Sequence, residues 1–297
     1  MDTFKILLGP MRAPFLILTP ACVAVGVGTA YWQTRTLNGW YVLLVLIGAV
    51  SAHICVNAFN EYFDFRSGLD AKTQRTPFSG GSGTLQAHPE LERTALLLSL
   101  VTLGITALVG AFFVWLRGWL LLPLGLFGLL LLVSYTIWWT SNPFLCLIAP
   151  GLGFGVLMVM GTHFALTGTY TWTSFIASLV PTFLVSNLLL LNQYPDVEPD
   201  REIGRKHYPI TAGLQRSTLI YGSQLLLTYL SIVVGVILGL LPVFSLLALL
   251  TAILAWRVYN GVRQNAENIP GLIPFMGQNV IITISTPVLL AVGLFIG

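Results

Sequence analysis

The sequence predicts an all-α integral membrane protein, a polytopic bundle of about nine transmembrane helices. Three observations indicate this class. Hydrophobic residues make up 56% of the 297 residues and charged residues only 8%, and the mean hydropathy is +0.83. The apolar residues also gather in uncharged runs of roughly 20, the length that a helix needs to cross about 30 Å of hydrocarbon. These runs lack the alternation of barrel strands, and helices satisfy their own backbone hydrogen bonds in lipid.

The apolar runs define nine predicted spans, which form a single domain over residues 1–297. In chain order the spans cover residues 14–33, 40–60, 94–116, 119–139, 144–166, 172–192, 217–240, 242–256 and 272–296. The first resembles a signal peptide, because Lys5 and Arg12 precede it, but the eight further spans favour an uncleaved helix. The eighth is short, which indicates a tilted or broken helix.

The charged residues gather on one side of the predicted bundle. Of the 14 Lys and Arg residues only Arg35 and Arg117 fall on the other side. The positive-inside rule therefore predicts a multi-pass protein with its N-terminus and its charged loops in the cytoplasm. All 11 carboxylates, from Asp2 to Glu267, share that side. We expect membrane lipid, and no nucleic acid, among the partners.

Two segments hold most of this charge, and the first is residues 61–93. Asn57, Asn60 and Asp64 are three or four residues apart, so they share one helix face at the end of the second span, with His53 on the same face but deeper. Polar side chains on an apolar span usually face the bundle interior, because a carboxylate toward lipid is costly. Asp70 follows in the loop.

The second charged segment is residues 196–216, after the sixth span. Asn192, Asp196 and Asp200 are spaced by four. They would stack on one face if the helix continued past Pro195, although Pro199 disfavours such a continuation.

Two facing sets of carboxylates predict a site for a metal and an anion. Mg²⁺ prefers oxygen ligands, and proteins hold it with one or two carboxylates plus substrate phosphates, so the predicted ligand is a diphosphate. Four cations lie beside the carboxylates and could neutralise phosphate oxygens: Lys72, Arg75, Arg205 and Lys206. The Gly/Ser run at residues 76–85 fits a phosphate cradle and a mobile loop equally well.

At this point the two segments resemble the Asp-rich motifs of the UbiA superfamily of intramembrane aromatic prenyltransferases, specifically its menaquinone-pathway branch. NEYFDFRSGLD is similar to the first motif, N-D-Y-x-D-x-x-x-G-x-D. NQYPDVEPDREIGRKH is similar to the second, N-x-x-x-D-x-x-x-D-x-x-x-G-[KR], and residues 151–168 also resemble this branch. The resemblance covers most of the chain and implies a UbiA-like fold.

The resemblance implies Mg²⁺-dependent transfer of a polyprenyl group from a polyprenyl diphosphate to an aromatic acceptor. The implied acceptor is 1,4-dihydroxy-2-naphthoate or a related quinone precursor. The resemblance implies two sets of side chains that hold the metal and the diphosphate: Asn60, Asp64 and Asp70 on one side, and Asn192, Asp196 and Asp200 on the other. The four aspartates of these sets are also the implied catalytic residues. The further implied substrate-binding residues are Asn57, Arg75, Arg205 and Lys206.

The chain also departs from the family pattern. Glu61 replaces the usual Asp of the first motif, Pro195 stands where the branch often has Arg, and Phe154 stands where it commonly has Glu. The same chemistry on 4-hydroxybenzoate, a tetrapyrrole alcohol or a glycerol phosphate therefore stays open. A secondary transporter is a more distant alternative. A transporter needs polar groups near the midplane and access from both sides, whereas the charged residues of this chain stop at one face.

Several other polar and aromatic residues have ordinary interpretations. A packed, hydrogen-bonded histidine is favoured over a catalytic base for His53, and His88, His163 and His207 have no metal-ligand spacing, so they receive no role. Tyr135 and its Trp neighbours are expected as an aromatic belt at the membrane surface, with lining of the acceptor site as the lesser interpretation.

Overall fold

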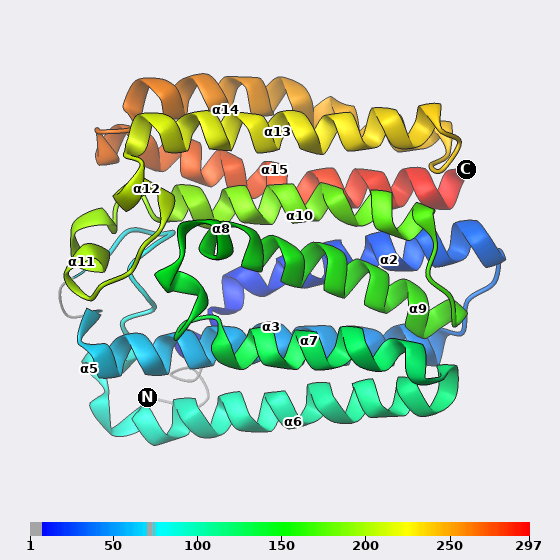
Figure 1. The fold of residues 1–297 in the computed structure, drawn as a ribbon, viewed down its shortest axis with the longest axis horizontal. Coiled ribbons are helices and arrows are strands. Elements are labelled where there is room, and N and C mark those ends of the chain that lie inside the picture. The colour runs from blue at the N-terminus through cyan, green and yellow to red at the C-terminus, as the bar shows by residue number, and fades with distance from the viewer. Residues whose placement is uncertain (1–7, 70–72, 74) are drawn as a thin grey trace.

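The computed structural model describes residues 8–69, 73 and 75–297, which form a bundle of long helices aligned along one axis (Figure 1). The described residues contain helices and no strands. The longer helices of the bundle, in chain order, are α2 (Leu18–Thr34), α3 (Gly39–Ser67), α6 (Glu92–Arg117), α7 (Leu122–Ser134), α8 (Pro143–Gly151), the π-helix η5 (Leu152–Met160), α9 (Gly161–Thr167), α10 (Trp172–Asn192), α13 (Leu214–Ile237), α14 (Ala252–Asn265) and α15 (Ile269–Ile296). The remaining helices and 3₁₀ turns are η1 (Ala13–Ile17), α5 (Thr84–Ala87), η2 (Pro89–Leu91), η3 (Trp119–Leu121), η4 (Trp139–Ser141), α11 (Val197–Glu202), α12 (Tyr208–Thr211) and η6 (Val243–Thr251).

Eight helical segments within the described residues are long and apolar enough to cross a membrane. They are Leu8–Thr34, Gly39–Ser67, Pro89–Arg117, Pro143–Thr167, Trp172–Asn192, Leu214–Ile237, Val243–Asn265 and Ile269–Ile296. A ninth apolar helix, Trp119–Ser134, is shorter. The predicted all-α membrane bundle is confirmed, and each of the nine predicted spans has a helix.

The predicted lengths of two spans were wrong. The fourth ends at Ser134 rather than at residue 139, because the chain turns there and a new helix begins behind the Asn142 cap, whose side chain accepts hydrogen bonds from the N–H groups of Phe144 and Leu145. The eighth is longer than predicted. It starts as the 3₁₀ helix η6 and continues as α14 to Asn265.

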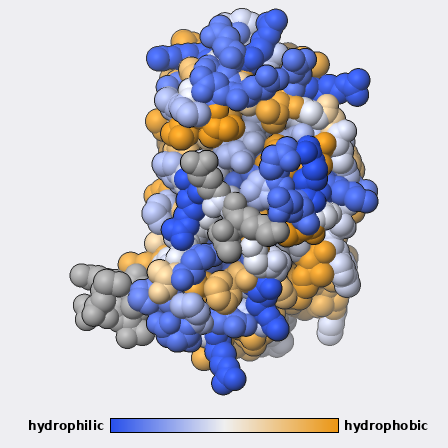
Figure 2. Space-filling model, turned by 90° about the vertical axis from the view of Figure 1, so that its left-hand side faces the viewer, coloured by the Kyte–Doolittle hydropathy of each residue, from blue (hydrophilic) through white to orange (hydrophobic). Residues whose placement is uncertain are grey.

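One end of the bundle carries the charged loops (Figure 1). The described carboxylates lie where α3 ends, where α6 begins, in the segment after α10 and between α14 and α15. Figure 2 views this end directly and shows hydrophilic residues gathered on it. Arg35 and Arg117 follow or end helices that point to the opposite end. The predicted separation of charge between the two ends is therefore present in the fold.

The middle of the bundle contains a close contact that shapes the site. A Cβ added at Gly151 would lie 2.2 Å from the carbonyl oxygen of Thr182, and one added at Gly155 would lie 1.9 Å from Thr182 Oγ1. The α8–η5 segment can therefore approach α10 this closely only with glycine at these positions. Between them, Phe154 lies on the π-helical stretch, a local widening that often marks functional sites.

Candidate active site

The two acidic segments meet at the charged end of the bundle, as their positions in the sequence predict. Asp64, near the end of α3, and Asp200, in α11, are 6% and 3% exposed. Arg205 joins them: its guanidinium pairs with Asp64 Oδ1 and lies 3.0 Å from Asp200 Oδ1. Burial by itself would lower the pKa of Arg205, but the two carboxylates raise it above its usual value. Arg205 therefore acts as a fixed positive charge between the two motifs.

The helix of the sixth span ends where it was predicted to end and does not continue past Pro195. The helix α10 ends at Asn192, and α11 starts at Val197 with Asp196 as its N-cap residue. Proline has no backbone N–H and disfavours a helical residue before it, so the chain turns between the two helices. Asp196 and Asp200 still lie one helical turn apart, since the N–H of Asp200 donates to the carbonyl of Asp196 at 2.9 Å.

Asp196 is the described carboxylate best placed to accept another ligand. Its Oδ1 atom is buried and has no hydrogen-bond partner among the described residues. Burial, and after it the neighbouring Asp200, raises the pKa of Asp196 to about 7, while a hydrogen bond from Ser79 lowers it by less. A buried carboxylate oxygen without a partner is costly unless a cation or a donor reaches it.

Arg12, to which the sequence analysis gave no role in the site, completes the first motif. Its guanidinium donates to Asn60 Oδ1 at 2.8 Å and lies 3.5 Å from Glu61 Oε2. Asn57 fixes the same stretch of chain by donating to the carbonyl of Met11 at 2.9 Å. The only signal for Arg12 in the sequence is a cation directly before the first span.

The Gly/Ser run bridges the two motifs. Ser82 donates to Glu61 through its hydroxyl and through its N–H, which lies 3.2 and 3.1 Å from the two carboxylate oxygens. Glu61 is fully buried, and Ser79 hydrogen-bonds Asp196. These donors therefore serve the protein's own carboxylates, which makes the run a strap across the charged end.

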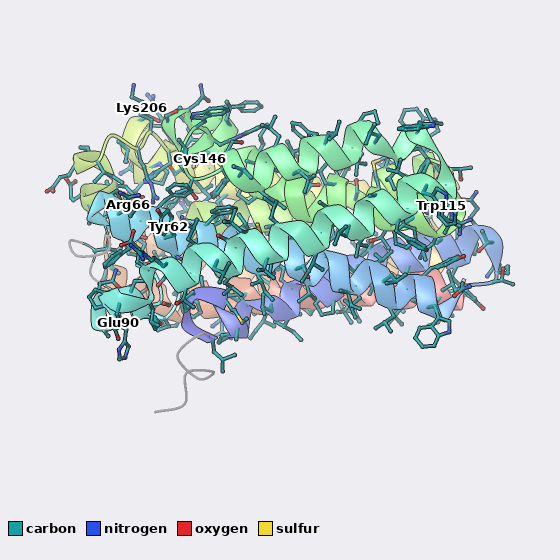
Figure 3. The ribbon with its side chains drawn as sticks, turned by 90° about the horizontal axis from the view of Figure 1, so that it is seen from below. Tyr62, Arg66, Glu90, Trp115, Cys146 and Lys206 are labelled. Atoms are coloured by element: carbon teal, nitrogen blue, oxygen red, sulfur yellow. The ribbon has the colours of Figure 1, made fainter. Side chains whose placement is uncertain are left out.

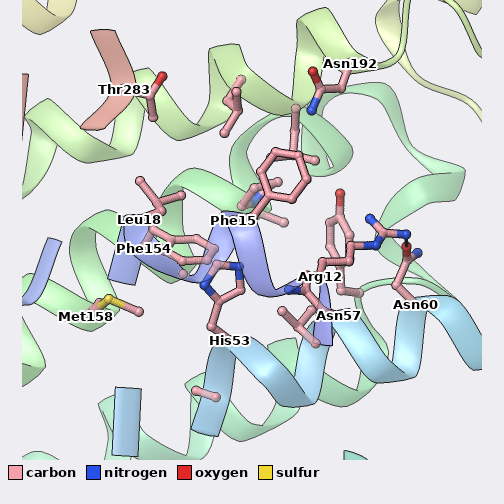
Figure 4. A pocket seen from close by; sticks show the side chains of 18 of the residues that line it. Arg12, Phe15, Leu18, His53, Asn57, Asn60, Phe154, Met158, Asn192 and Thr283 are labelled. Carbon is pink, nitrogen blue, oxygen red and sulfur yellow. Dashed lines mark hydrogen bonds between the residues drawn. The ribbon is translucent and has the colours of Figure 1, made fainter. Parts of the chain in front are cut away.

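A cavity of about 200 Å³ lies inside the bundle next to Arg12 and Asn60 (Figure 4). Arg12, Asn57, Asn60 and Asn192 line its polar end, and its deeper wall is largely apolar. The side chains that form this deeper wall include Phe15, Leu18, His53, Phe154 and Met158. Tyr135, directly after α7, also lines the cavity, and its contact with an acceptor stays a prediction.

A second cavity, of about 760 Å³, lies between α3, α6, α7 and residues 153–165. Its lining is apolar apart from Thr106 and Thr162, and it includes seven glycines: Gly48, Gly110, Gly118, Gly125, Gly128, Gly153 and Gly161. Five lining residues belong to both cavities: Ala52, Leu131, Leu132, Gly153 and Met158. The second cavity extends to Trp115, which Figure 3 places at the end of the bundle opposite Glu90 and Lys206.

Four further predicted residues lie at the edge of this site or outside the described residues. Arg75 is exposed, with its guanidinium over Gly83, and Lys206 is exposed and points outward (Figure 3). Asp70 and Lys72 lie outside the described residues. His207, which received no role, is buried with its Nε2 atom 2.9 Å from Asp200 Oδ2. The sequence signal for His207 is only its place directly after the second motif.

The donor types at this end suit Mg²⁺, although the described side chains do not already form a cage for it. Carboxylates and amides supply the hard oxygen ligands that Mg²⁺ prefers. The Oδ1 atom of Asp196, which has no hydrogen-bond partner among the described residues, is free to coordinate the ion. Among the residues that the structure describes, no three His, Cys, Asp or Glu side chains are grouped so that they could share one ion. Arg205 holds Asp64 and Asp200 instead.

The fold and the site define an intramembrane enzyme whose charged end adjoins two largely apolar cavities. The chain belongs to the UbiA prenyltransferase family, whose sequence profile matches residues 19–276. The predicted class of transferase is thereby confirmed at the level of the family.

Individual relatives refine this assignment. The chain is 28% identical over 203 residues to the 1,4-dihydroxy-2-naphthoate octaprenyltransferase of Bacillus subtilis, covering 66% of this chain and 63% of that protein. It is 24% identical to the Haemophilus influenzae protein of the same name, over 96% of this chain and 94% of the relative. The predicted resemblance to the menaquinone-pathway branch agrees with both.

A solved structure supports the fold. A UbiA homolog from Archaeoglobus fulgidus, bound to DMAPP and Mg²⁺, superposes with a TM-score of 0.64 over 96% of this chain and 99% of that chain. The two sequences are 17% identical, so this likeness supports the bundle architecture only.

Proposed function

We propose that this protein transfers a polyprenyl group from a polyprenyl diphosphate to an aromatic acceptor in an Mg²⁺-dependent reaction. The acceptor that we propose is 1,4-dihydroxy-2-naphthoate or a related quinone precursor. One observation carries the proposal: the two acidic motifs converge on the polar end of a cavity whose apolar wall continues into a second, apolar cavity. A ligand with a charged head and a hydrocarbon tail fits this combination.

The head of the donor is assigned to the two motifs. Asp64, Asp196 and Asp200 would hold Mg²⁺ together with Asn60 and Asn192, and Asp70 is proposed to join them. When bound, the ion neutralises the diphosphate and so eases the departure of that group. Arg205 and Arg12 already lie beside these side chains, where their charges can stabilise the departing oxygens. Arg75 and Lys206 are proposed to act only at the rim.

The tail of the donor is assigned to the second cavity. Its glycines leave open space, since a Cβ added at Gly110 or Gly125 would meet no atom within 4 Å. Breaking the bond between C1 of the prenyl chain and the diphosphate oxygen leaves an allylic cation, which the aromatic ring then attacks. The attacked ring carbon then loses its proton, or its carboxylate as CO2, and the ring becomes aromatic again. Apolar walls exclude water that would otherwise quench that cation.

The acceptor is assigned to the deeper part of the first cavity. Two supports favour a naphthoate: the names of the Bacillus and Haemophilus relatives, and a wall that offers aromatic faces from Phe15 and Phe154. The positive-inside rule predicts that this end of the bundle faces the cytoplasm, from which a water-soluble acceptor could enter.

The acceptor assignment is tested by competition. Purified protein in detergent receives geranylgeranyl diphosphate, Mg²⁺ and an equimolar mixture of 1,4-dihydroxy-2-naphthoate, 4-hydroxybenzoate and glycerol phosphate, and mass spectrometry identifies the prenylated products. We expect the naphthoate product to dominate. Dominance of either other product would overturn the acceptor while keeping the chemistry. Absence of diphosphate release with every donor would overturn the prenyl transfer itself.

A further inference from the structure

The bundle contains two buried histidines that each bond a threonine, yet only one uses both ring nitrogens. His163 is fully buried; its Nδ1 atom lies 3.0 Å from Thr29 Oγ1 and its Nε2 atom 3.3 Å from Thr171 Oγ1. His53 is 6% exposed and its Nδ1 atom lies 2.8 Å from Thr19 Oγ1. Its Nε2 atom has no hydrogen bond to any residue that the structure describes. One buried imidazole is satisfied, and the other has a free nitrogen.

The free nitrogen of His53 belongs to a side chain that lines the first cavity. Figure 4 shows the imidazole rising from α3 toward Phe154. The two rings meet edge to face, with centroids 4.6 Å apart and planes at 81°. Thr19 and Phe154 therefore hold the imidazole from two sides. His53 Nε2 is not among the fully buried atoms that lack a partner, so it is accessible from the cavity, where a ligand can supply the missing partner.

Depth in the cavity decides which ligand can supply it. Asn60 and His53 are seven residues apart on α3, which is about 10 Å along the helix axis. The diphosphate is held at the Asn60 level in the proposed function, so it is too far away. The prenyl chain carries no hydrogen-bonding group. An aromatic ring bearing a hydroxyl remains, because its faces pack against Phe154 and Phe15 while its hydroxyl reaches the nitrogen.

We propose that His53 binds the acceptor, with its Nε2 atom hydrogen-bonded to a ring hydroxyl and Phe154 packed against the ring. This inference rests on the proposed function and adds the group that recognises the acceptor. A neutral imidazole can donate or accept this hydrogen bond, so the hydroxyl and not a charge is recognised. The sequence favoured a packed histidine at this position, and the bond to Thr19 agrees with that packing. The sequence pattern around His53 could not show that its Nε2 atom is left without a partner.

The test measures binding, so that it does not depend on turnover. The affinities of 1,4-dihydroxy-2-naphthoate and of 2-naphthoate, which lacks both hydroxyls, are determined by calorimetry on the unmodified protein, on His53→Phe and on His53→Gln. We expect the unmodified protein to prefer the hydroxylated ring by roughly three- to tenfold, the worth of one hydrogen bond. His53→Phe should abolish that preference, and His53→Gln, which keeps a polar group, should retain part of it.

His163→Phe is the matched control, because it removes a buried histidine of the same kind that does not line the first cavity. It should leave the preference for the hydroxylated ring unchanged. Using the ratio of two affinities removes any effect of a partly unfolded sample. Equal affinities on the unmodified protein, or an unchanged ratio in His53→Phe, would overturn the inference. A preference lost in His53→Phe together with no diphosphate release from any donor would support His53 and contradict the transfer reaction.

Discussion

The two cavities share a wall but differ in what the rest of their lining offers a ligand. The first combines Arg12, three asparagines and His53 with aromatic rings, whereas the second has no polar lining beyond Thr106 and Thr162. Glycines open the second cavity, and large side chains narrow the first, which has a volume of about 200 Å³ against about 760 Å³. In the proposed reaction the two halves of the donor would therefore be held in different ways: charge and hydrogen bonds would fix the head, and open space would accommodate the tail.

The largest effect is expected at the charged end. Asp64→Asn and Asp196→Asn each remove a negative charge from the proposed metal site at almost constant volume, so turnover should fall by roughly a hundredfold or more. The rate of product formation at saturating Mg²⁺ measures this. Glu198→Gln is the matched control, because Glu198 is exposed on α11 and pairs with Arg201 at the surface. Near-normal turnover in both aspartate variants would show that the head region lies elsewhere.

The next effect should separate donors by length. Gly110 lines the second cavity, so the larger side chain of Gly110→Leu should fill part of it. This variant should lower kcat/KM for geranylgeranyl diphosphate by about tenfold relative to geranyl diphosphate. The reason is that filling the cavity costs on the order of 1–3 kcal/mol for the longer chain. Gly104→Leu is the control on the same helix. Position 104 is also free of neighbours within 4 Å, but it is exposed on the outside of the bundle and does not line either cavity. The same loss in both variants would refute the tail assignment.

A comparable effect is expected from pH, and it should be confined to the head region. Because the pKa of Asp196 is raised to about 7, this carboxyl is mostly neutral at pH 6 and mostly charged at pH 8. Metal binding needs the charged form, so the affinity for Mg²⁺ should rise about tenfold over this interval. Without metal the sign is opposite for folding: the folded state keeps a proton that the unfolded state has lost, so stability falls as pH rises from 3.8 to about 7.

Calorimetric titration of Mg²⁺ in the presence of an unreactive thiodiphosphate donor analogue checks the pH prediction. The Asp196→Asn variant has no group to titrate at this position and should show a much flatter profile. A profile that keeps the same slope in this variant would assign the titration to another group.

The smallest effect is expected at Lys206, which the sequence placed beside Arg205 among the substrate-binding residues. The side chain of Arg205 is 16% exposed and lies between two carboxylates, whereas the side chain of Lys206 is exposed and points away from the site. Lys206→Gln should therefore raise the KM for the donor by about twofold at most, because solvent and salt screen an exposed charge. A much larger increase would place Lys206 in contact with the diphosphate.

Local patterns in the sequence predicted the fold and the meeting of the two motifs well. Long apolar runs report helices, and an even number of crossings between the two acidic segments returns the chain to the same end of the bundle. Spacing of three and four on α3 also predicted that Asn57, Asn60 and Asp64 share one face.

The parts that could not be predicted depend on contacts between distant residues or on how the chain turns. Arg12 reaches Asn60 across 48 positions, and no periodicity announces such a pair. The return of His207 to Asp200 depends on how the chain turns after α11. Arg205 and Lys206 are adjacent cations in the sequence, and only the direction of each side chain in the fold shows which of them contacts the acidic motifs.

The measurement that tests the central claim most directly is the Mg²⁺ dependence of prenyl transfer by the purified protein. Geranylgeranyl diphosphate and 1,4-dihydroxy-2-naphthoate are incubated with the protein and Mg²⁺, or with EDTA, and prenylated naphthoate and released diphosphate are quantified by mass spectrometry and a phosphate assay. We expect both products in equal amounts with Mg²⁺ and neither with EDTA. Full turnover in EDTA would contradict the metal site built from the two acidic motifs, and no turnover with Mg²⁺ would contradict the proposed reaction.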